Sequence, residues 1–222
     1  PAINKGKKYR KWFLKQFPTV ITWRNDIGHP NKINHYQTFP WHIARYKKDN
    51  KIIYTKNYDD FKNIKTYEKT KLISVITSNK TYCEGHKKRI EFVNALINHF
   101  GDKIDVYGSG IKYIEDKWDA IAPYKYHIAI ENSSFDNYWT EKLGDAYLGG
   151  AYPFYYGCPN IKDYFPDQAI TCIDINDAEK SIQIIEDTLK NNLYEQSIDS
   201  LLIAKDLILD KYNFFQAMAE FC

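Results

Sequence analysis

The residues best suited to chemistry lie close together, in the segment ENSSFDNYWTEK at positions 131–142. Lys142 supplies a cation that could pair with phosphate, and Glu141 supplies a carboxylate that could accept hydrogen bonds from the two hydroxyls of a ribose. Thr140 suits the N-cap of a helix, where free backbone N–H groups also bind phosphate. These residue types could bind a nucleotide that carries phosphates and a sugar. Taken alone, they also fit a plain helix cap at Thr140 and Glu141 and a surface lysine at Lys142.

The elements around this segment are those that would place it at one edge of a sheet. The apolar run Ile128–Ile130 predicts a buried strand that ends at Glu131. A helical pattern begins at Thr140 and stops at Gly149-Gly150, and Tyr152–Tyr156 predicts the next strand. Open α/β sheets bind ligands at the carboxyl ends of their strands, which is where this polar segment falls.

Strand and helix patterns alternate through the rest of the chain from residue 72 onward. Apolar runs predict strands at 72–78, 104–107 and 169–173, and helical periodicity predicts helices at 87–100, 178–189 and 194–212. This order predicts an α/β fold with a doubly wound parallel sheet. The glycine turn at 108–110 lacks the third glycine of a dinucleotide-binding motif and indicates an ordinary turn. Residues 17–23 predict one further strand, and 51–70 predict a polar connecting segment.

Three separated pieces of sequence also agree in order and spacing with a known family. They are ENS at 131–133, Y-x-T-E-K four residues later, and Y-G-C-P-N-I at 156–161. Residues 72–165 therefore resemble the donor-binding half of family 10 glycosyltransferases, the α-1,3-fucosyltransferases. The run RIEFVNAL, which begins at Arg89, is similar to the family's R-x-x-F-x-x-A-L, in which the arginine contacts the donor diphosphate.

The resemblance implies a Rossmann-like domain of the GT-B type and an inverting glycosyltransferase. It implies that fucose is transferred from GDP-fucose to a cell-surface glycan, with Arg89 and Lys142 on the diphosphate and Glu141 on the ribose. The full donor-binding set that it implies is Arg89, Asn132, Ser133, Tyr138, Thr140, Glu141 and Lys142. Two alternatives stay open: a related transferase that uses another nucleotide sugar, and a non-catalytic module that binds nucleotide sugars.

The chain contains no Asp-x-Asp motif, the usual ligand of a metal-bound diphosphate in the other large glycosyltransferase architecture. We therefore expect a metal-independent reaction, with no cofactor besides the donor substrate. The histidines of the first fifty residues have spacings that fit no zinc site. The cysteines Cys83, Cys158, Cys172 and Cys222 are widely spaced and predict reduced thiols in a cytoplasmic protein.

The family's acceptor-side domain supplies a carboxylate as general base, usually a glutamate. Here no glutamate precedes Glu68, and the region before the first clear strand is short for a complete acceptor domain. We expect a short or truncated acceptor-side region at residues 1–70 and a nucleotide-sugar-binding domain at 71–222. Asp26, which follows the strand-like run at 17–23, is the candidate base, and a histidine is the alternative.

Charge divides the chain at the same boundary. Residues 1–70 carry 16 basic and 5 acidic side chains, a net charge of +11, whereas residues 71–222 carry 15 and 23, a net charge of −8. The basic region could contact a membrane surface peripherally or a lipid-linked glycan acceptor. We expect no nucleic-acid partner, because no RNA- or DNA-binding motif accompanies the lysines.

Overall fold

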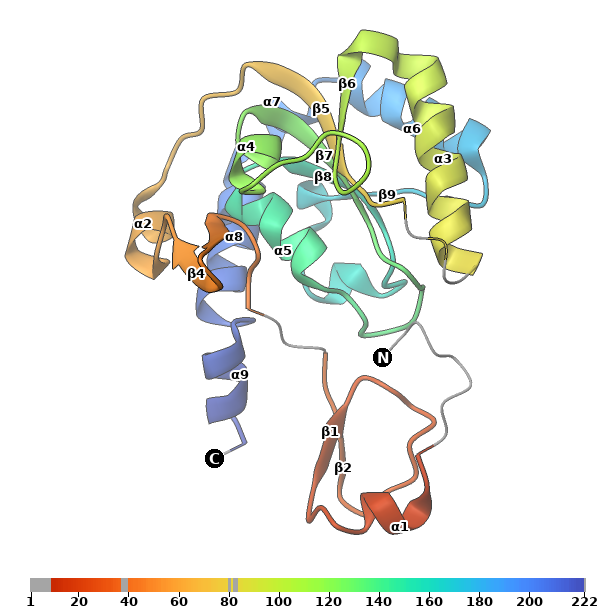
Figure 1. The fold of residues 1–222 in the computed structure, drawn as a ribbon, viewed down its shortest axis with the longest axis vertical. Coiled ribbons are helices and arrows are strands. Elements are labelled where there is room, and N and C mark those ends of the chain that lie inside the picture. The colour runs from red at the N-terminus through yellow and green to blue at the C-terminus, as the bar shows by residue number, and fades with distance from the viewer. Residues whose placement is uncertain (1–8, 37–39, 80, 82–83, 222) are drawn as a thin grey trace.

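The computed structural model describes residues 9–36, 40–79, 81 and 84–221. Its centre is a five-stranded sheet in the order β6-β5-β7-β8-β9, in which every neighbouring pair is parallel. The strands are Lys71–Ile76 (β5), Ile104–Tyr107 (β6), Tyr124–Ile130 (β7), Tyr152–Tyr156 (β8) and Thr171–Cys172 (β9). The predicted parallel α/β sheet is thus confirmed (Figure 1).

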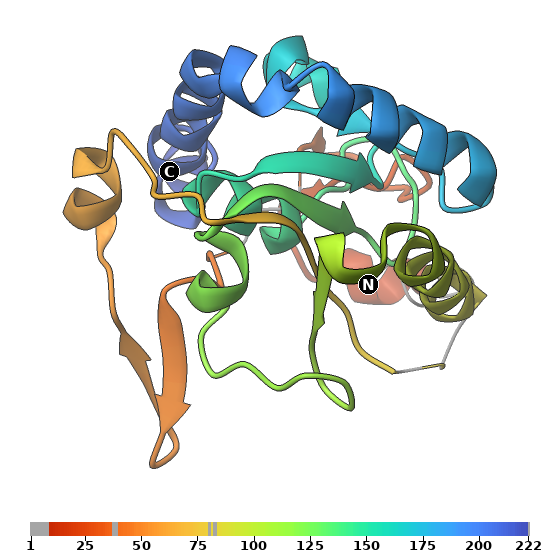
Figure 2. The same cartoon turned by 90° about the horizontal axis from the view of Figure 1, so that it is seen from above.

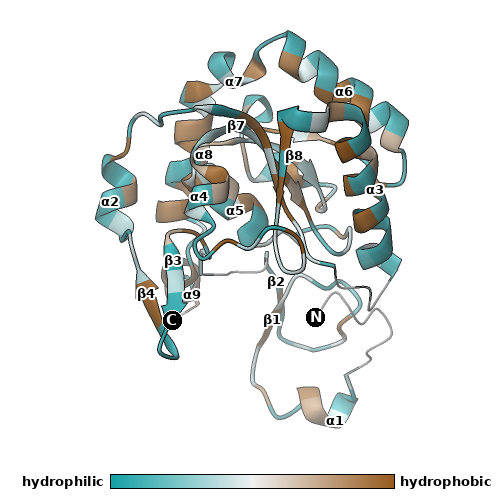
Figure 3. Cartoon of the chain, turned by 45° about the horizontal axis from the view of Figure 1, so that its top comes forward, coloured by the Kyte–Doolittle hydropathy of each residue, from teal (hydrophilic) through white to brown (hydrophobic). Residues whose placement is uncertain are grey.

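The apolar, β-branched and aromatic composition of the central strands follows from their burial on both faces. In β7 six of the seven residues are buried, and Ile73 and Val75 of β5 are almost fully covered. Figure 3 shows the hydrophobic residues concentrated on these strands and alternating with polar residues along the surrounding helices. Burial of this surface is the main stabilising contribution to the sheet.

The chain reverses its direction of progress across the sheet between β5 and β7. From β5 it passes through α3 (Glu84–Phe100) to β6 on one side, and from β7 it passes through α5 (Glu141–Leu148) to β8 on the other. Right-handed crossovers that leave in opposite directions place α3 and α5 on opposite faces of the sheet. A crevice opens where the two connections diverge, beyond the carboxyl ends of β5 and β7.

Further helices follow along the chain, and most of them pack around the sheet. They are α4 (Trp118–Ile121), α6 (Ala178–Lys190), α7 (Leu193–Gln196), α8 (Ile198–Asp210) and α9 (Phe214–Ala219), with 3₁₀ turns at Gly101–Lys103, Ile161–Asp163 and Asp167–Ala169. Helix α6 packs against α3, and α8 packs against α5. In Figure 2 the blue C-terminal helices form a row along one side of the sheet. Among the described residues, we find no helix long and apolar enough to cross a membrane.

The prediction of a single helix at 194–212 is wrong, because the chain forms two helices, α7 and α8, with a break at Ser197. The backbone N–H of Tyr194 donates to the hydroxyl of Tyr126 on β7, at 3.2 Å. This bond fixes the short helix α7 to the sheet, and α8 then begins in a new direction. The strand expected at 169–173 is shorter, because residues 167–169 form a 3₁₀ turn.

The described residues before position 70 form small units around the sheet. Helix α1 (Lys11–Leu14) precedes a two-stranded parallel ribbon of β1 (Val20–Thr22) and β2 (Lys32–Asn34). A hairpin of β3 (Arg45–Lys48) and β4 (Lys51–Tyr54) is followed by α2 (Tyr58–Asn63). The interpretation of residues 51–70 as a connecting segment was therefore incomplete.

Part of this front region joins the main core. Ile43 and Phe61 are fully buried within the same apolar cluster as β5, β7 and β8. The change of charge at residue 70 therefore does not coincide with a break in the hydrophobic core. The division into an acceptor-side region and a nucleotide-sugar domain stays a prediction. Of the cysteines, Cys158 and Cys172 are free thiols, and Cys83 and Cys222 lie outside the described residues.

Candidate functional site

A cavity of about 400 Å³ lies at the carboxyl ends of β5 and β7. At this point the chain reverses its direction of progress across the sheet. This is the position at which doubly wound sheets bind nucleotides. Its polar lining comes from several elements and consists of His42, Thr77, Ser78, Arg89, Ser109, Lys117, His127, Glu141, Lys142 and Asp145. Arg89, Glu141 and Lys142, three of the residues predicted from the sequence, thus meet in one cavity.

Glu131 organises the wall of this cavity, although it is fully buried. Its carboxylate accepts hydrogen bonds from the backbone N–H and the hydroxyl of Thr140, each at 2.8 Å, and from the ammonium group of Lys142 at 3.1 Å. The residue that follows β7 thereby fixes the first residues of α5. Thr140 in turn is the N-cap of α5, and its side chain accepts from the backbone N–H of Lys142 at 3.4 Å.

Lys142 carries its charge toward the cavity between two carboxylates. Burial disfavours the ammonium ion, but Glu131 and Glu141 outweigh burial and raise the pKa of Lys142. Burial would also favour the neutral acid at Glu141, yet Lys142 and Lys117 outweigh it and lower the pKa of Glu141. Both side chains are therefore ionised at neutral pH.

The guanidinium of Arg89 is hydrogen-bonded to groups that follow β5 and β7. Its guanidinium donates to Oδ1 of Asn132 at 2.5 Å and to the carbonyl and hydroxyl of Ser78, each at 3.4 Å. The side chain is 6 % exposed and lines the cavity. Asn132 therefore holds the guanidinium of Arg89 in position. The positive charge of that guanidinium faces the cavity, where an anion could bind.

Three glycines let the backbone come close enough to build the site. A Cβ at Gly157 would lie 2.5 Å from Cγ of Glu131, and a Cβ at Gly85 would lie 2.3 Å from the carbonyl oxygen of Asn132. Gly108 has a positive φ of 135°, and a Cβ there would lie 1.5 Å from the carbonyl oxygen of Thr77. The 108–110 turn, interpreted from sequence as ordinary, thus forms a wall of the cavity.

Lys117 and Asp145 were missed in the sequence. The ammonium group of Lys117 lies 2.7 Å from Oδ2 of the buried Asp145, whose Oδ1 accepts from the backbone N–H groups of His42 and Ile43 at 2.7 and 3.1 Å. Asp145 therefore joins the front region, α5 and the cavity. The periodicity of α5 does not indicate this, because a charged residue within a helix is expected on its solvent face, whereas Asp145 is buried.

The other predicted residues are not among those that line the cavity. Ser133 donates its hydroxyl to the carbonyl oxygen of Asn132 at 2.8 Å. Tyr138 is 6 % exposed and packs against Trp23 of the front region, with ring centroids 4.9 Å apart. Asp26 is exposed and forms an ion pair with Arg24 at 2.5 Å. The bond from Arg24 lowers the pKa of Asp26, which weakens it as a base.

The arrangement can bind a diphosphate. Arg89, Lys117 and Lys142 converge with the N-terminus of the eight-residue helix α5, whose dipole also favours an anion. Hydrogen bonds and ion pairs hold each cation in place before a ligand arrives, so little ordering is required on binding. We find no group of three or more metal-ligating side chains among the described residues.

The chain has a Rossmann-like fold of the GT-B type, with a polar cavity at the carboxyl ends of its strands. The family model "Glycosyltransferase family 10 (fucosyltransferase) C-term" matches residues 66–195. The chain therefore belongs to glycosyltransferase family 10, and the matched part is the C-terminal region of that family. This finding confirms the resemblance seen in the ENS, Y-x-T-E-K and Y-G-C-P-N-I segments.

Relatives and solved structures agree with this placement. The chain is 29% identical over 120 residues to α-(1,3)-fucosyltransferase B of Drosophila melanogaster, and this match covers 47% of this chain and 26% of the relative. It is 30% identical over 95 residues to α-(1,3)-fucosyltransferase FucT of Helicobacter pylori, covering 40% of this chain and 20% of the relative. The crystal structure of TarM shares the fold, with a TM-score of 0.54 and 12% identity over 95% of this chain and 44% of that one. The chain thus matches about a quarter or less of the length of these curated relatives.

Proposed function

We propose that this chain binds GDP-fucose as the donor-binding part of an inverting fucosyltransferase that acts on a hydroxyl of a cell-surface glycan. The observation that carries the proposal is the convergence of Arg89, Lys117 and Lys142 on one cavity beside the N-terminus of α5. The diphosphate would lie against these cations, and the ribose hydroxyls would donate to Glu141. Membership of the fucosyltransferase family supports fucose as the transferred sugar.

The chemistry follows from this placement. The acceptor oxygen attacks the anomeric carbon of fucose from the side opposite the diphosphate, a C–O bond forms, and the bond from that carbon to the diphosphate oxygen breaks. The electron pair stays on GDP, and the hydroxyl proton passes to a general base. Arg89 and Lys142 would stabilise the charge that develops on the leaving diphosphate, so that no metal ion is needed for this step.

The acceptor side of the proposal depends on the front region. Its net charge of +11 suits an acceptor linked to an anionic lipid and a peripheral contact with a membrane from the cytoplasm. Trp23 packs on Tyr138, which places the β1–β2 ribbon next to the segment that leads to α5. Asp26 stays the proposed base, and an acceptor that displaces Arg24 from it would raise its pKa toward that of an ordinary carboxylate.

Two alternatives share the same cavity. A related transferase would use another nucleotide sugar, because no described contact yet distinguishes guanine from other bases. A non-catalytic module would bind the donor without turnover. Binding of different nucleotide sugars distinguishes the first alternative from the main proposal, and a measurement of sugar transfer distinguishes the second.

A thermal-shift series with GDP-fucose, GDP and the corresponding UDP, CDP and dTDP sugars tests donor choice. We expect GDP and GDP-fucose to raise the melting temperature with or without EDTA, since a ligand at about 100 times its Kd stabilises by about 2.7 kcal/mol. Stabilisation by UDP-sugars alone, or its loss with EDTA, would contradict the proposal. Transfer of labelled fucose to a glycan acceptor then separates an enzyme from a binding module.

A further inference from the structure

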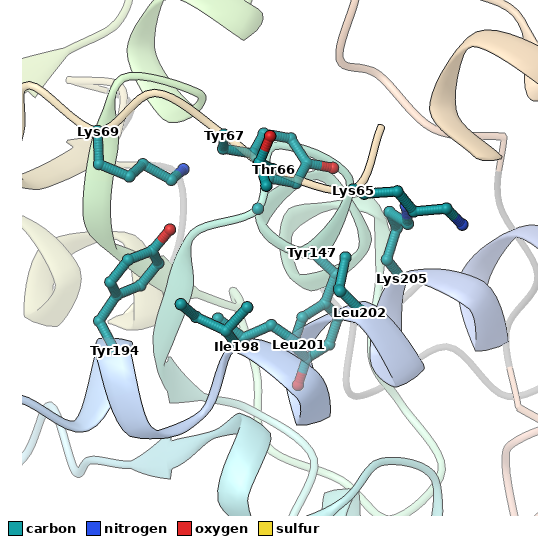
Figure 4. A pocket seen from close by; sticks show the side chains of 11 residues that line it. Lys65, Thr66, Tyr67, Lys69, Tyr147, Tyr194, Ile198, Leu201, Leu202 and Lys205 are labelled. Carbon is teal, nitrogen blue, oxygen red and sulfur yellow. The ribbon is translucent and has the colours of Figure 1, made fainter. Parts of the chain in front are cut away.

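A second cavity lies at the opposite end of the sheet from the candidate donor site. Its volume is about 230 Å³, and it sits between the segment that leads into β5 and the first turns of α8 (Figure 4). Aliphatic and aromatic side chains form most of its wall, and lysines supply its charge. Of the described residues that line this lysine-lined cavity, none is acidic.

Lys69 is one of its cations and is fixed by two helix ends. Its ammonium group donates to the carbonyl oxygens of Ala122 and Gly149, each at 2.8 Å, which are the C-cap residues of α4 and α5. It also lies 4.9 Å from the ring centroid of Tyr67 and 5.8 Å from that of Tyr194. An ammonium group has three N–H donors, so one remains beyond the two carbonyl bonds.

Lys205 repeats the arrangement on the other side of the cavity. Its ammonium group donates to the carbonyl oxygens of Phe61 and Ile64, at 3.0 and 2.5 Å, at the C-terminal end of α2. Asp206 favours the charge of Lys205, but its carboxylate lies 3.1 Å from Lys62. Both ammonium groups thus donate to neutral carbonyl oxygens. Among the described residues, neither group forms an ion pair with a carboxylate.

We propose that this cavity is a second binding site, specific for a small carboxylate with an apolar body. The carboxylate would accept the remaining N–H of Lys69, and the body would lie between the ring of Tyr67 and the aliphatic side chains of Ile198 and Leu201. The volume, below the usual 300 Å³ of drug-sized pockets, limits the body to about one ring. Burial lowers the pKa of Lys69 to about 7, and a carboxylate partner would restore its charged form.

The two cavities are separate sites on one helix. Glu141 and Lys142 at the N-terminus of α5 line the donor cavity, whereas Tyr147 and Gly150 at its C-terminal end line the second. Diphosphate groups would not fit the second cavity, because its apolar wall could not solvate their additional charges. The proposal therefore does not depend on the donor assignment.

The test uses 3-phenylpropionate as the probe, measured by isothermal titration calorimetry on the whole chain. We expect saturable 1:1 binding, at least about tenfold weaker binding of the uncharged analogue 3-phenylpropan-1-ol, and a similar weakening for propionate, which lacks the ring. Excess GDP should leave the affinity unchanged. Competition by GDP, or equal affinity for the alcohol, would overturn the proposal.

Variants locate the binding. Lys69→Met should weaken it about tenfold or more by removing the charged donor, and Leu202→Trp should abolish it by filling the cavity while Lys69 stays in place. Lys180→Met, at an exposed position on α6, serves as the matched control. Unchanged binding in both Lys69→Met and Leu202→Trp, or no binding by wild type at about 10 mM probe, would refute the site.

Discussion

The ammonium nitrogen of Lys142 lies 3.1 Å from Oε2 of Glu131, a carboxylate with no exposed surface. The same carboxylate binds the backbone and hydroxyl of Thr140. The ENS segment at the end of β7 and the T-E-K segment at the start of α5 are therefore one structural unit. Burial raises the pKa of Glu131, while Lys142 and Thr140 favour its ionised form. This buried carboxyl group after β7 positions the helix N-terminus and the cation that would receive a phosphate.

Glu131→Gln should lower the free energy of unfolding by about 1.5–3 kcal/mol, the usual value of hydrogen bonds to a charged group. The amide keeps one acceptor for Thr140 but cannot neutralise Lys142, which is partly buried. Urea denaturation monitored by circular dichroism measures the change. Because Lys142 would lose its anchor, we expect GDP affinity to fall as well.

Glu141→Gln is the matched control for stability. Glu141 lies 3.5 Å from Lys142 but its side chain is 16 % exposed, so water can replace part of the lost interaction. We expect a cost below about 1 kcal/mol, as for other partly solvated ion pairs. If both variants lose the same stability, Glu131 does not organise the helix start.

Arg89→Ala and Lys142→Ala should each weaken GDP binding by about 1.5–3 kcal/mol, roughly 10- to 150-fold in Kd. Each removes a cation that lines the cavity and that other groups already hold in position. Isothermal titration calorimetry with GDP gives the affinities, and circular dichroism checks that the variants are folded.

Lys88→Ala provides the comparison for the α3 variant. Lys88 precedes Arg89 but bonds outward to the side chain of Asn176 at 2.7 Å, away from the cavity. We expect its loss to change GDP affinity less than about twofold, because solvated surface charges contribute little. An equal loss of affinity in Lys88→Ala and Arg89→Ala would show that α3 presents a different face to the ligand.

Stability should fall with acid because of His127. This side chain is 3 % exposed, its Nδ1 lies 2.8 Å from the hydroxyl of Ser74, and burial together with Lys117 and Lys69 lowers its pKa to about 3. In the unfolded chain the pKa returns to about 6.5. The unfolded state therefore binds the extra proton between these values, and unfolding becomes about 2 kcal/mol easier at pH 5 than at pH 7.

Urea denaturation of wild type and His127→Asn at pH 7 and pH 5 isolates this contribution. The asparagine can keep a hydrogen bond to Ser74 but does not titrate, so its stability should lose about 2 kcal/mol less over the same interval. His99→Asn, at an exposed position on α3, should retain most of the wild-type slope. Identical slopes in wild type and His127→Asn would mean that folding does not shift the pKa of His127.

The sequence predicts the parallel sheet well, because buried strands such as β5 and β8 are short apolar runs bounded by polar or glycine residues. It does not predict the β3–β4 hairpin. That hairpin depends on Asp49 and Asn50, both with positive φ, rather than on alternation of apolar residues. Helix α2 was missed for a similar reason, since its main signal is the capping box between Asn57 and Asp60.

Within the candidate site, the sequence indicates residues that form a recognisable local pattern. Arg89, Glu141 and Lys142 all line the cavity, and their donor-binding role stays a prediction. Lys117 and Asp145 meet only through the tertiary fold, across 28 positions of sequence, so no local spacing could reveal their ion pair. Assignment of Glu131 as an anchor required knowing that it is buried, which its position after a strand does not determine.

The general base gives the last prediction. If Asp26 removes the proton of the acceptor hydroxyl, Asp26→Asn should lower the rate of fucose transfer by about 10²–10⁴-fold and leave GDP affinity nearly unchanged. Asp26 is exposed and forms an ion pair with Arg24, and the bond from Arg24 lowers the pKa of Asp26. Arg24→Ala should therefore raise this pKa and shift the acid limb of the pH–rate profile to higher pH. Transfer to a glycan acceptor and calorimetry with GDP measure the two properties separately. Equal turnover in wild type and Asp26→Asn would remove Asp26 from the reaction, whereas GDP binding without turnover in either protein would place the base outside the residues of this chain.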